Sequence, residues 1–199
     1  MFARLGRVFL IVVLINLYVS DSLALEKKSV TIHVVSDSLV KWSYSGKTNW
    51  KNSKLCYVHP SWTQEMQGDW IWVSEKTNPH IDYKASPKDG WYFKKEFKLP
   101  SKAKSISGTI VIAADNAYQL FINNNFVSGS VGPLSKDFGK NGEIELRPSF
   151  QYPDSIDITD KLRRGKNSIV VRVVNYGKWG SYDSNPAGLT FDAQVSYEK

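Results

Sequence analysis

Residues 167–174 read Asn-Ser-Ile-Val-Val-Arg-Val-Val, and this stretch indicates the fold class. Ile169, Val171 and Val173 alternate with positions that include Arg172. That two-residue period is typical of a strand with one buried face and one partly wet face. Similar β-branched or aromatic runs recur along the chain, separated by Gly, Pro, Asn and Asp. Because helical periodicity is weak throughout, the sequence predicts an all-β sandwich or barrel.

The predicted elements of the mature chain are strands, with one short exception. They are residues 29–35, 39–42, 90–99, 107–114, 118–122, 143–146, 154–158, 167–174 and 189–197. Residues 44–72 are aromatic-rich and irregular. At residues 158–162 we expect a single helical turn with Thr159 as its cap. Gly165 should supply the positive φ that follows this turn.

The first residues have the pattern of a secretory signal peptide. Arg4 and Arg7 precede an apolar stretch over residues 8–19, and Ser22-Leu23-Ala24 supplies the small residues of a cleavage site. The stretch is shorter than the roughly 20 apolar residues that span a bilayer. We therefore expect cleavage after Ala24, a secreted mature chain over residues 25–199, and no membrane span.

The mature chain should form one basic domain. About 175 residues suit a single core, and no internal repeat or linker divides them. Cleavage lowers the formal charge from +7 to +6. The basic residues are dispersed rather than gathered in a dense stripe, so nucleic acid is disfavoured as a partner and affinity for anionic polymers is a secondary interpretation.

Cys56 is the one cysteine of the chain, so it has no partner for an internal disulfide. Its neighbours Leu55, Tyr57 and Val58 are apolar. A free thiol packs as a small hydrophobe, which favours a packed side chain over an intermolecular bridge. Both interpretations stay open on sequence grounds.

Four segments in the second half of the chain occur in a characteristic order. They are WIW at 70–72 with WYFKKEF at 91–97, AADNAYQLFINN at 113–124, ITDKL at 158–162 with GKNSIVV at 165–171, and NPAGL at 185–189. Together, over residues 70–199, they resemble the galactose-binding-like jelly roll, a β-sandwich found as sugar-binding modules of glycoside hydrolases and as stand-alone secreted domains. The resemblance implies ligand binding at loops of one sandwich end, and calcium supports such loops in some members of that family.

The conformational preferences of the turn residues in these segments independently favour turns at the same positions. Asp115 and Asn116 can fold their side chains back onto the backbone in a turn. Asn123, Asn124 and Asn125 tolerate the left-handed conformations of a tight hairpin. The resembled family usually has Gly where this chain has Asn124, and Asn is the next best residue for that geometry.

Catalytic and metal-binding patterns are weak. The histidines at positions 33, 59 and 80 lack metal-ligand spacing, and Cys56 has no neighbouring base. Asp154, Asp157 and Asp160 recur every three residues, but at a strand-to-turn junction they fit caps and turns better than calcium ligands. We therefore expect neither a catalytic constellation nor a cofactor, apart from structural calcium as the resemblance implies.

Aromatic residues give the better candidate site, since sugar rings stack on aromatic side chains and planar polar groups satisfy the hydroxyls. Trp70, Trp72 and Trp91 lie in apolar strands, where core packing is favoured. The candidates for carbohydrate binding lie in loop-like segments, where an aromatic ring can either present a stacking face or fold back over the core. They are Trp179, Tyr182, Asp183, Trp50 and Trp62.

Three functions fit these observations. The first is a secreted, non-catalytic, lectin-like protein that binds a glycan or extracellular polysaccharide. The second is an extracellular matrix or coat component that self-associates or binds anionic polymer or mineral. The third, a catalytic domain, has the least support. The fold alone does not select among them.

Overall fold

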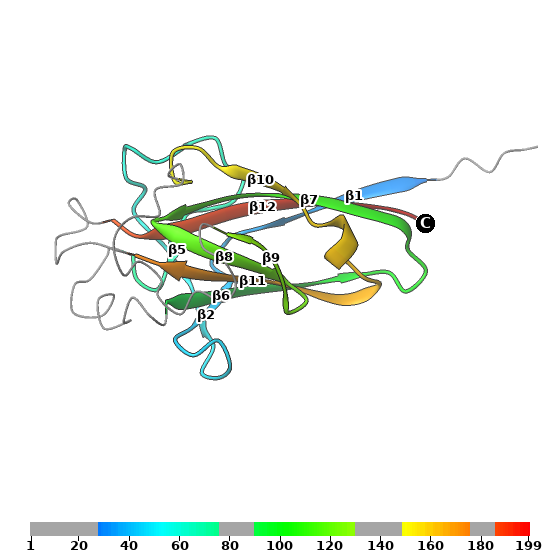
Figure 1. The fold of residues 1–199 in the computed structure, drawn as a ribbon, viewed down its shortest axis with the longest axis horizontal. Helices are drawn as coiled ribbons and strands as arrows, with labels where there is room; N and C mark the ends of the chain where they lie inside the picture. The colour runs from blue at the N-terminus through cyan, green and yellow to red at the C-terminus, as the bar shows by residue number, and fades with distance from the viewer. Residues whose placement is uncertain (1–27, 76–89, 130–148, 176–185) are drawn as a thin grey trace, which may run out of the picture.

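The computed structural model describes residues 28–75, 90–129, 149–175 and 186–199. These residues form two antiparallel sheets packed face to face, so the predicted all-β sandwich is confirmed (Figure 1). Sheet A has the order β10-β7-β12-β5-β4, with β1 also paired to β12, and sheet B has the order β3-β2-β6-β11-β8-β9.

The long strands lie inside the sheets and the short ones at several edges. Sheet A contains β1 (Ser29–Val35), β4 (Lys54–Leu55), β5 (Ile71–Trp72), β7 (Lys104–Asp115), β10 (Asp154–Asp157) and β12 (Gly188–Glu198). Sheet B contains β2 (Lys41–Ser43), β3 (Lys51–Asn52), β6 (Trp91–Leu99), β8 (Ala117–Ile122), β9 (Asn125–Gly129) and β11 (Gly165–Val174). The strand predicted at 143–146 lies outside the described residues.

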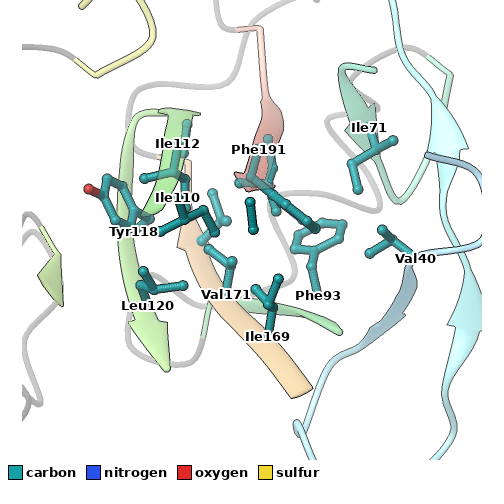
Figure 2. Close-up of a cluster of buried hydrophobic side chains, with 14 of the residues drawn as sticks. Val40, Ile71, Phe93, Ile110, Ile112, Tyr118, Leu120, Ile169, Val171 and Phe191 are labelled. Atoms are coloured by element: carbon teal, nitrogen blue, oxygen red, sulfur yellow. The ribbon is translucent and has the colours of Figure 1, made fainter. Parts of the chain in front are cut away.

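The alternating pattern of the sequence builds the core between the sheets. Val171 of β11 pairs with Phe93 of β6 and with Leu120 of β8, and all three side chains are buried. Ile112 and Phe191 face them from sheet A (Figure 2). Burying a side chain of this kind is worth roughly 1.5–3 kcal/mol. The three tryptophans predicted for the core, Trp70, Trp72 and Trp91, are all buried.

The predicted hairpin and turn glycine are confirmed. Asn123 and Asn124 join β8 to β9 with φ angles of 52° and 67°, and Gly165 has a φ of 77°. The Asn123 side chain also donates to the Lys161 carbonyl and to the Asn167 side chain, both at 2.8 Å. The hairpin is therefore tied to the corner that precedes β11.

The short turn is present as a 3₁₀ helix over Thr159–Lys161, but Thr159 is not its cap. The carboxylate of Asp157 accepts the Thr159 N–H at 2.8 Å, and the Thr159 hydroxyl accepts the Gly108 N–H at 3.0 Å. The threonine therefore fastens the turn to β7. Asp157 is the turn-forming residue, as its position in the sequence predicted, and its carboxyl pKa is lowered by the hydrogen bonds from Thr159.

Candidate functional site

Trp62 lies on the outer face of sheet A. Its ring stacks on Trp70 at 4.2 Å between centroids, and both rings pack over Ala113 of β7. Only 3% of Trp62 is exposed. A Cβ at Gly188 would lie 2.6 Å from the Trp62 ring, so the ring rests directly on the β12 backbone. The exposed stacking face predicted for Trp62 is therefore absent, because this ring folds back over the sheet.

Asp115 anchors this covered region. Its carboxylate accepts the Trp62 indole N–H at 2.9 Å instead of folding back onto its own turn, which corrects the expectation from the sequence. The side chain is buried, and burial raises the pKa of the Asp115 carboxyl to about 7, against the opposing effect of the Trp62 hydrogen bond. The pair closes the end of sheet A where β7 passes to β8.

Cys56 packs against the same covered region. Its side chain is partly buried beside the main core and the Trp62 and Trp70 cluster, as the packed interpretation predicted. Burial raises the pKa of the Cys56 thiol to about 12. The thiol is therefore protonated at neutral pH, and a protonated thiol is a poor nucleophile.

A different set of side chains lies on the outer face of sheet B. Because Phe93, Val171 and Leu120 point into the core, their strand neighbours point outward. One outward row crosses four strands in register, from Ser43 through Tyr92 and Arg172 to Gln119. Ser43 and Gln119 at its ends are buried, whereas Tyr92 and Arg172 are partly exposed. The Arg172 guanidinium carbon lies 5.8 Å from the Tyr92 ring centroid, and an Arg172 nitrogen donates to the Gln119 amide oxygen at 3.2 Å.

The loop between β2 and β3 packs against this row at Tyr92. Gly46, with a φ of 69°, lies so close to the Tyr92 ring that a Cβ there would be 2.8 Å from it. Trp50 lies at the end of the same loop, with the Lys94 ammonium nitrogen 4.4 Å from its ring centroid. Its indole N–H donates to the Lys47 carbonyl at 3.3 Å. We call the four partly exposed residues Trp50, Tyr92, Lys94 and Arg172 the sheet B face.

The five side chains predicted for the site are therefore not gathered at one place. Trp50 borders the sheet B face, whereas Trp62 lies on the outer face of sheet A. Trp179, Tyr182 and Asp183 lie outside the described residues. Sequence reasoning missed Tyr92, Gln119 and Arg172: the alternation around Arg172 places it on a wet face, but the row becomes visible only with the strand register.

A cleft lies along another side of the sandwich, where β3 of sheet B continues into β4 of sheet A. It has a volume of about 640 Å³. Leu39, Leu55 and Tyr57 line it and are 68%, 51% and 45% exposed. The cleft shares no lining residue with the sheet B face. Tyr57 is therefore an exposed aromatic side chain that can serve as a control for those of the sheet B face.

Within the ranges that the structure describes, no three His, Cys, Asp or Glu side chains gather into a metal site. Asp154 accepts the Tyr118 hydroxyl at 2.6 Å, and Asp160 pairs with Lys161. Among the same residues there is no long apolar helix of the kind that crosses a bilayer.

Comparisons with known proteins do not assign a family. No family model matches the sequence, and no curated protein matches it. A family 2 glycosyl hydrolase from Bacteroides cellulosilyticus is similar in structure, with a TM-score of 0.47 and 14% identity over 82% of this chain and 20% of that chain. A β-D-glucuronidase from Dictyoglomus thermophilum has a TM-score of 0.45 and 15% identity over 82% of this chain and 28% of that chain.

An α-L-rhamnosidase from Streptomyces avermitilis has a TM-score of 0.40 and 20% identity over 77% of this chain and 12% of that chain. The chain thus spans less than a third of the length of each of these three structures. With TM-scores below 0.5, the similarities carry no weight in assigning a function.

Proposed function

We propose that this chain is a secreted, non-catalytic protein that binds carbohydrate on the sheet B face. The observation that carries the proposal is the pairing of the partly exposed Tyr92 ring with the Arg172 guanidinium, with Trp50 at its border. Gln119 is buried and supports this pair by accepting a hydrogen bond from Arg172. Aromatic rings offer faces for the C–H side of a sugar, and the planar Arg172 guanidinium offers hydrogen bonds for its hydroxyls.

The charges of this face favour binding over hydrolysis. Glycoside hydrolysis uses two carboxyl groups on either side of the scissile bond, roughly 5–10 Å apart. Among the outward-facing described residues of β6 and β11 there is one carboxylate, Glu96, and it pairs with Lys94 at 3.3 Å. On the described part of this face, a bound sugar would therefore meet hydrogen-bonding groups without an acid and base pair.

A glycan array on the mature chain tests the proposal. We expect at least one glycan to bind, and we expect Tyr92→Ala and Trp50→Ala to weaken that binding roughly tenfold or more, as is typical when a central aromatic contact is removed. Tyr57→Ala is the matched control and should leave binding unchanged. Trp179→Ala, Tyr182→Ala and Asp183→Ala test the loop predicted from the sequence.

Two results would count against the proposal in different ways. An array without any signal above background would reject carbohydrate binding altogether. Binding that survives Tyr92→Ala and Trp50→Ala, but is lost in Trp179→Ala, would move the site from the sheet B face to the loop.

One observation favours a second function, that of a self-assembling extracellular component. β1 pairs with β12 along one side, and its other side pairs with no strand among the described residues. Its seven residues, Ser29–Val35, include no Pro, Lys, Asp or Glu. A strand from another molecule can pair with such an edge, because its backbone N–H and C=O groups are unpaired and no charged side chain opposes the approach.

Light scattering on the mature chain over a range of concentrations tests this second function. Assembly through β1 should increase with concentration and should be abolished by Thr31→Lys, which places a charge on the edge strand. A monomer at every concentration would exclude self-assembly through this edge.

A further inference from the structure

The outer face of sheet B carries an unusual pattern of charge. Lys41 of β2 stands directly opposite Lys94 of β6, and Lys98 of β6 stands directly opposite Lys166 of β11. Directly opposite residues share a face and have Cβ atoms about 5 Å apart, where like charges repel and destabilise the sheet. Two such pairs on one face are unfavourable for the fold on its own.

Few acidic side chains of the described residues neutralise these lysines. Lys94 pairs with Glu96 at 3.3 Å, but the side chain of Glu96 is 63% exposed. Within the described residues, no acidic side chain forms an ion pair with Lys41, Lys98 or Lys166. These three side chains are exposed, so their charges point toward solvent. Lys95, by contrast, points to the other side of β6 and pairs with Asp37 at 2.7 Å.

The outer face of sheet A differs in sign. Its outward positions on the described strands carry exposed or partly exposed Asp192, Glu198 and Asp157 together with the buried Asp115, against two lysines, Lys54 and Lys104. Among the outward strand residues that the structure describes, basic side chains therefore outnumber acidic ones on the outer face of sheet B, which also carries Tyr92, but not on that of sheet A. Lysines that are dispersed in the sequence thus share one face of sheet B, because the strand register brings them together.

We infer that the glycan bound on the sheet B face is anionic, with carboxylate or sulfate groups that the Lys41–Lys94 and Lys98–Lys166 pairs neutralise. This inference rests on the proposed carbohydrate-binding function and adds the class of ligand. The two pairs are four residues apart along β6, which is about 13 Å of strand. A chain with repeated acidic groups spans both pairs, whereas a single acidic sugar reaches one. An acidic polysaccharide is therefore the ligand that relieves both repulsions.

The test compares polymers that differ only in charge. Dextran sulfate and dextran share one backbone, and polygalacturonate and its methyl-esterified form share another, so each pair isolates sulfate or carboxylate. Calorimetric titration of the mature chain should show at least tenfold tighter binding of one charged polymer than of its neutral partner. This preference should weaken as salt is raised, because exposed charges are screened within about 8 Å at physiological ionic strength.

Variants locate the effect on the protein. Lys41→Gln with Lys94→Gln, and Lys98→Gln with Lys166→Gln, should each weaken binding of the charged polymer roughly tenfold, as expected for losing charge-assisted contacts. Lys102→Gln with Lys104→Gln removes the same charge from exposed positions outside the outer face of sheet B and should leave binding nearly unchanged. A thermal melt of each variant confirms that it is folded.

The possible results separate the inference from the proposed function. Equal binding of charged and neutral polymers, still sensitive to Tyr92→Ala, would overturn the inference and keep carbohydrate binding. No binding of any polymer would overturn both. An equal loss in the Lys102 and Lys104 control would show an effect of net charge alone and overturn the inference. Lysine-dependent binding of double-stranded DNA without binding of either charged polymer would overturn it as well.

Discussion

Trp50 and Trp62 are twelve positions apart in an irregular, aromatic-rich segment, yet they lie on opposite outer faces of the sandwich. Trp62 is stacked on Trp70, holds Asp115 and rests on Gly188. Trp50 is only partly buried and is flanked by the ammonium group of Lys94. Residue type and sequence neighbourhood are nearly the same for the two rings. The two rings differ in what lies beneath them: Gly188 has no side chain, so the Trp62 ring packs directly on the backbone of sheet A.

The comparison shows that the two outer faces differ in how much of their surface is covered by packed side chains. The outer face of sheet A is covered at the Asp115 end by buried aromatic packing. The outer face of sheet B carries the partly exposed Tyr92 ring and two pairs of lysines that repel each other. One region should therefore govern stability, and the other should contribute little to stability and be available for binding.

The largest expected effect is on the covered region. Trp62→Ala should lower the free energy of unfolding by about 5 kcal/mol, because it leaves a large cavity and removes the hydrogen bond to buried Asp115. Trp50→Ala should cost less than about 0.5 kcal/mol, as is usual for surface positions. Urea unfolding of the two variants measures both values. Equal losses would break the comparison.

Asp115 should make stability depend on pH. Its pKa of about 7 in the fold lies above its ordinary value of 3.8, so between these values the folded state holds a proton that the unfolded state has lost. Stability should therefore fall as pH rises from about 4 to 7, by up to roughly 4 kcal/mol in total. Asp115→Asn keeps the shape and cannot ionise.

Unfolding of wild type and Asp115→Asn at several pH values isolates this contribution. The variant should gain stability relative to wild type as pH rises through the window and should stay level above it. Parallel curves for the two proteins would mean that the carboxyl is not sensitive to its burial under Trp62.

Gly188→Ala should cost about 2 kcal/mol, since the new methyl group overlaps the Trp62 and Trp70 rings. Gly165→Ala is the instructive control. No atom lies within 4 Å of a Cβ there, but the φ of 77° makes Ala strained, so we expect about 1 kcal/mol. Thermal melts of both variants compare steric overlap with backbone strain. A harmless Gly188→Ala would show that the ring layer is loose.

The smallest expected effect has the opposite sign. Lys98→Gln should raise the free energy of unfolding by a few tenths of a kcal/mol, about 0.3, because it relieves the repulsion with Lys166. Lys102→Gln, which lies outside that pair, should be neutral. Chemical unfolding at low salt resolves the difference best, and a destabilised Lys98→Gln would show that the lysine pair supports the fold.

The two-residue period predicted much of the fold, because it reports directly which side chains face a core. It predicted the wet position of Arg172 and the buried positions of Ile169, Val171 and Val173. It failed for Trp62, which sits in a segment without any period, so its burial depends on a tertiary contact with Gly188. The sheet B face stayed hidden for another reason: its residues come from separate strands and a loop, and only the pairing register brings Tyr92 beside Arg172.

The pairing of the first and last strands has a mechanical consequence. Ser29 pairs with Glu198, and the Lys199 N–H donates to the Lys28 carbonyl at 3.2 Å, so both strands leave the sandwich at the same end. A force pulling these two ends apart acts on the backbone hydrogen bonds between β1 and β12 one after another, starting at the Ser29 and Glu198 pair. The sandwich should therefore yield first by peeling off β1, at a force well below that needed to shear long strands past each other.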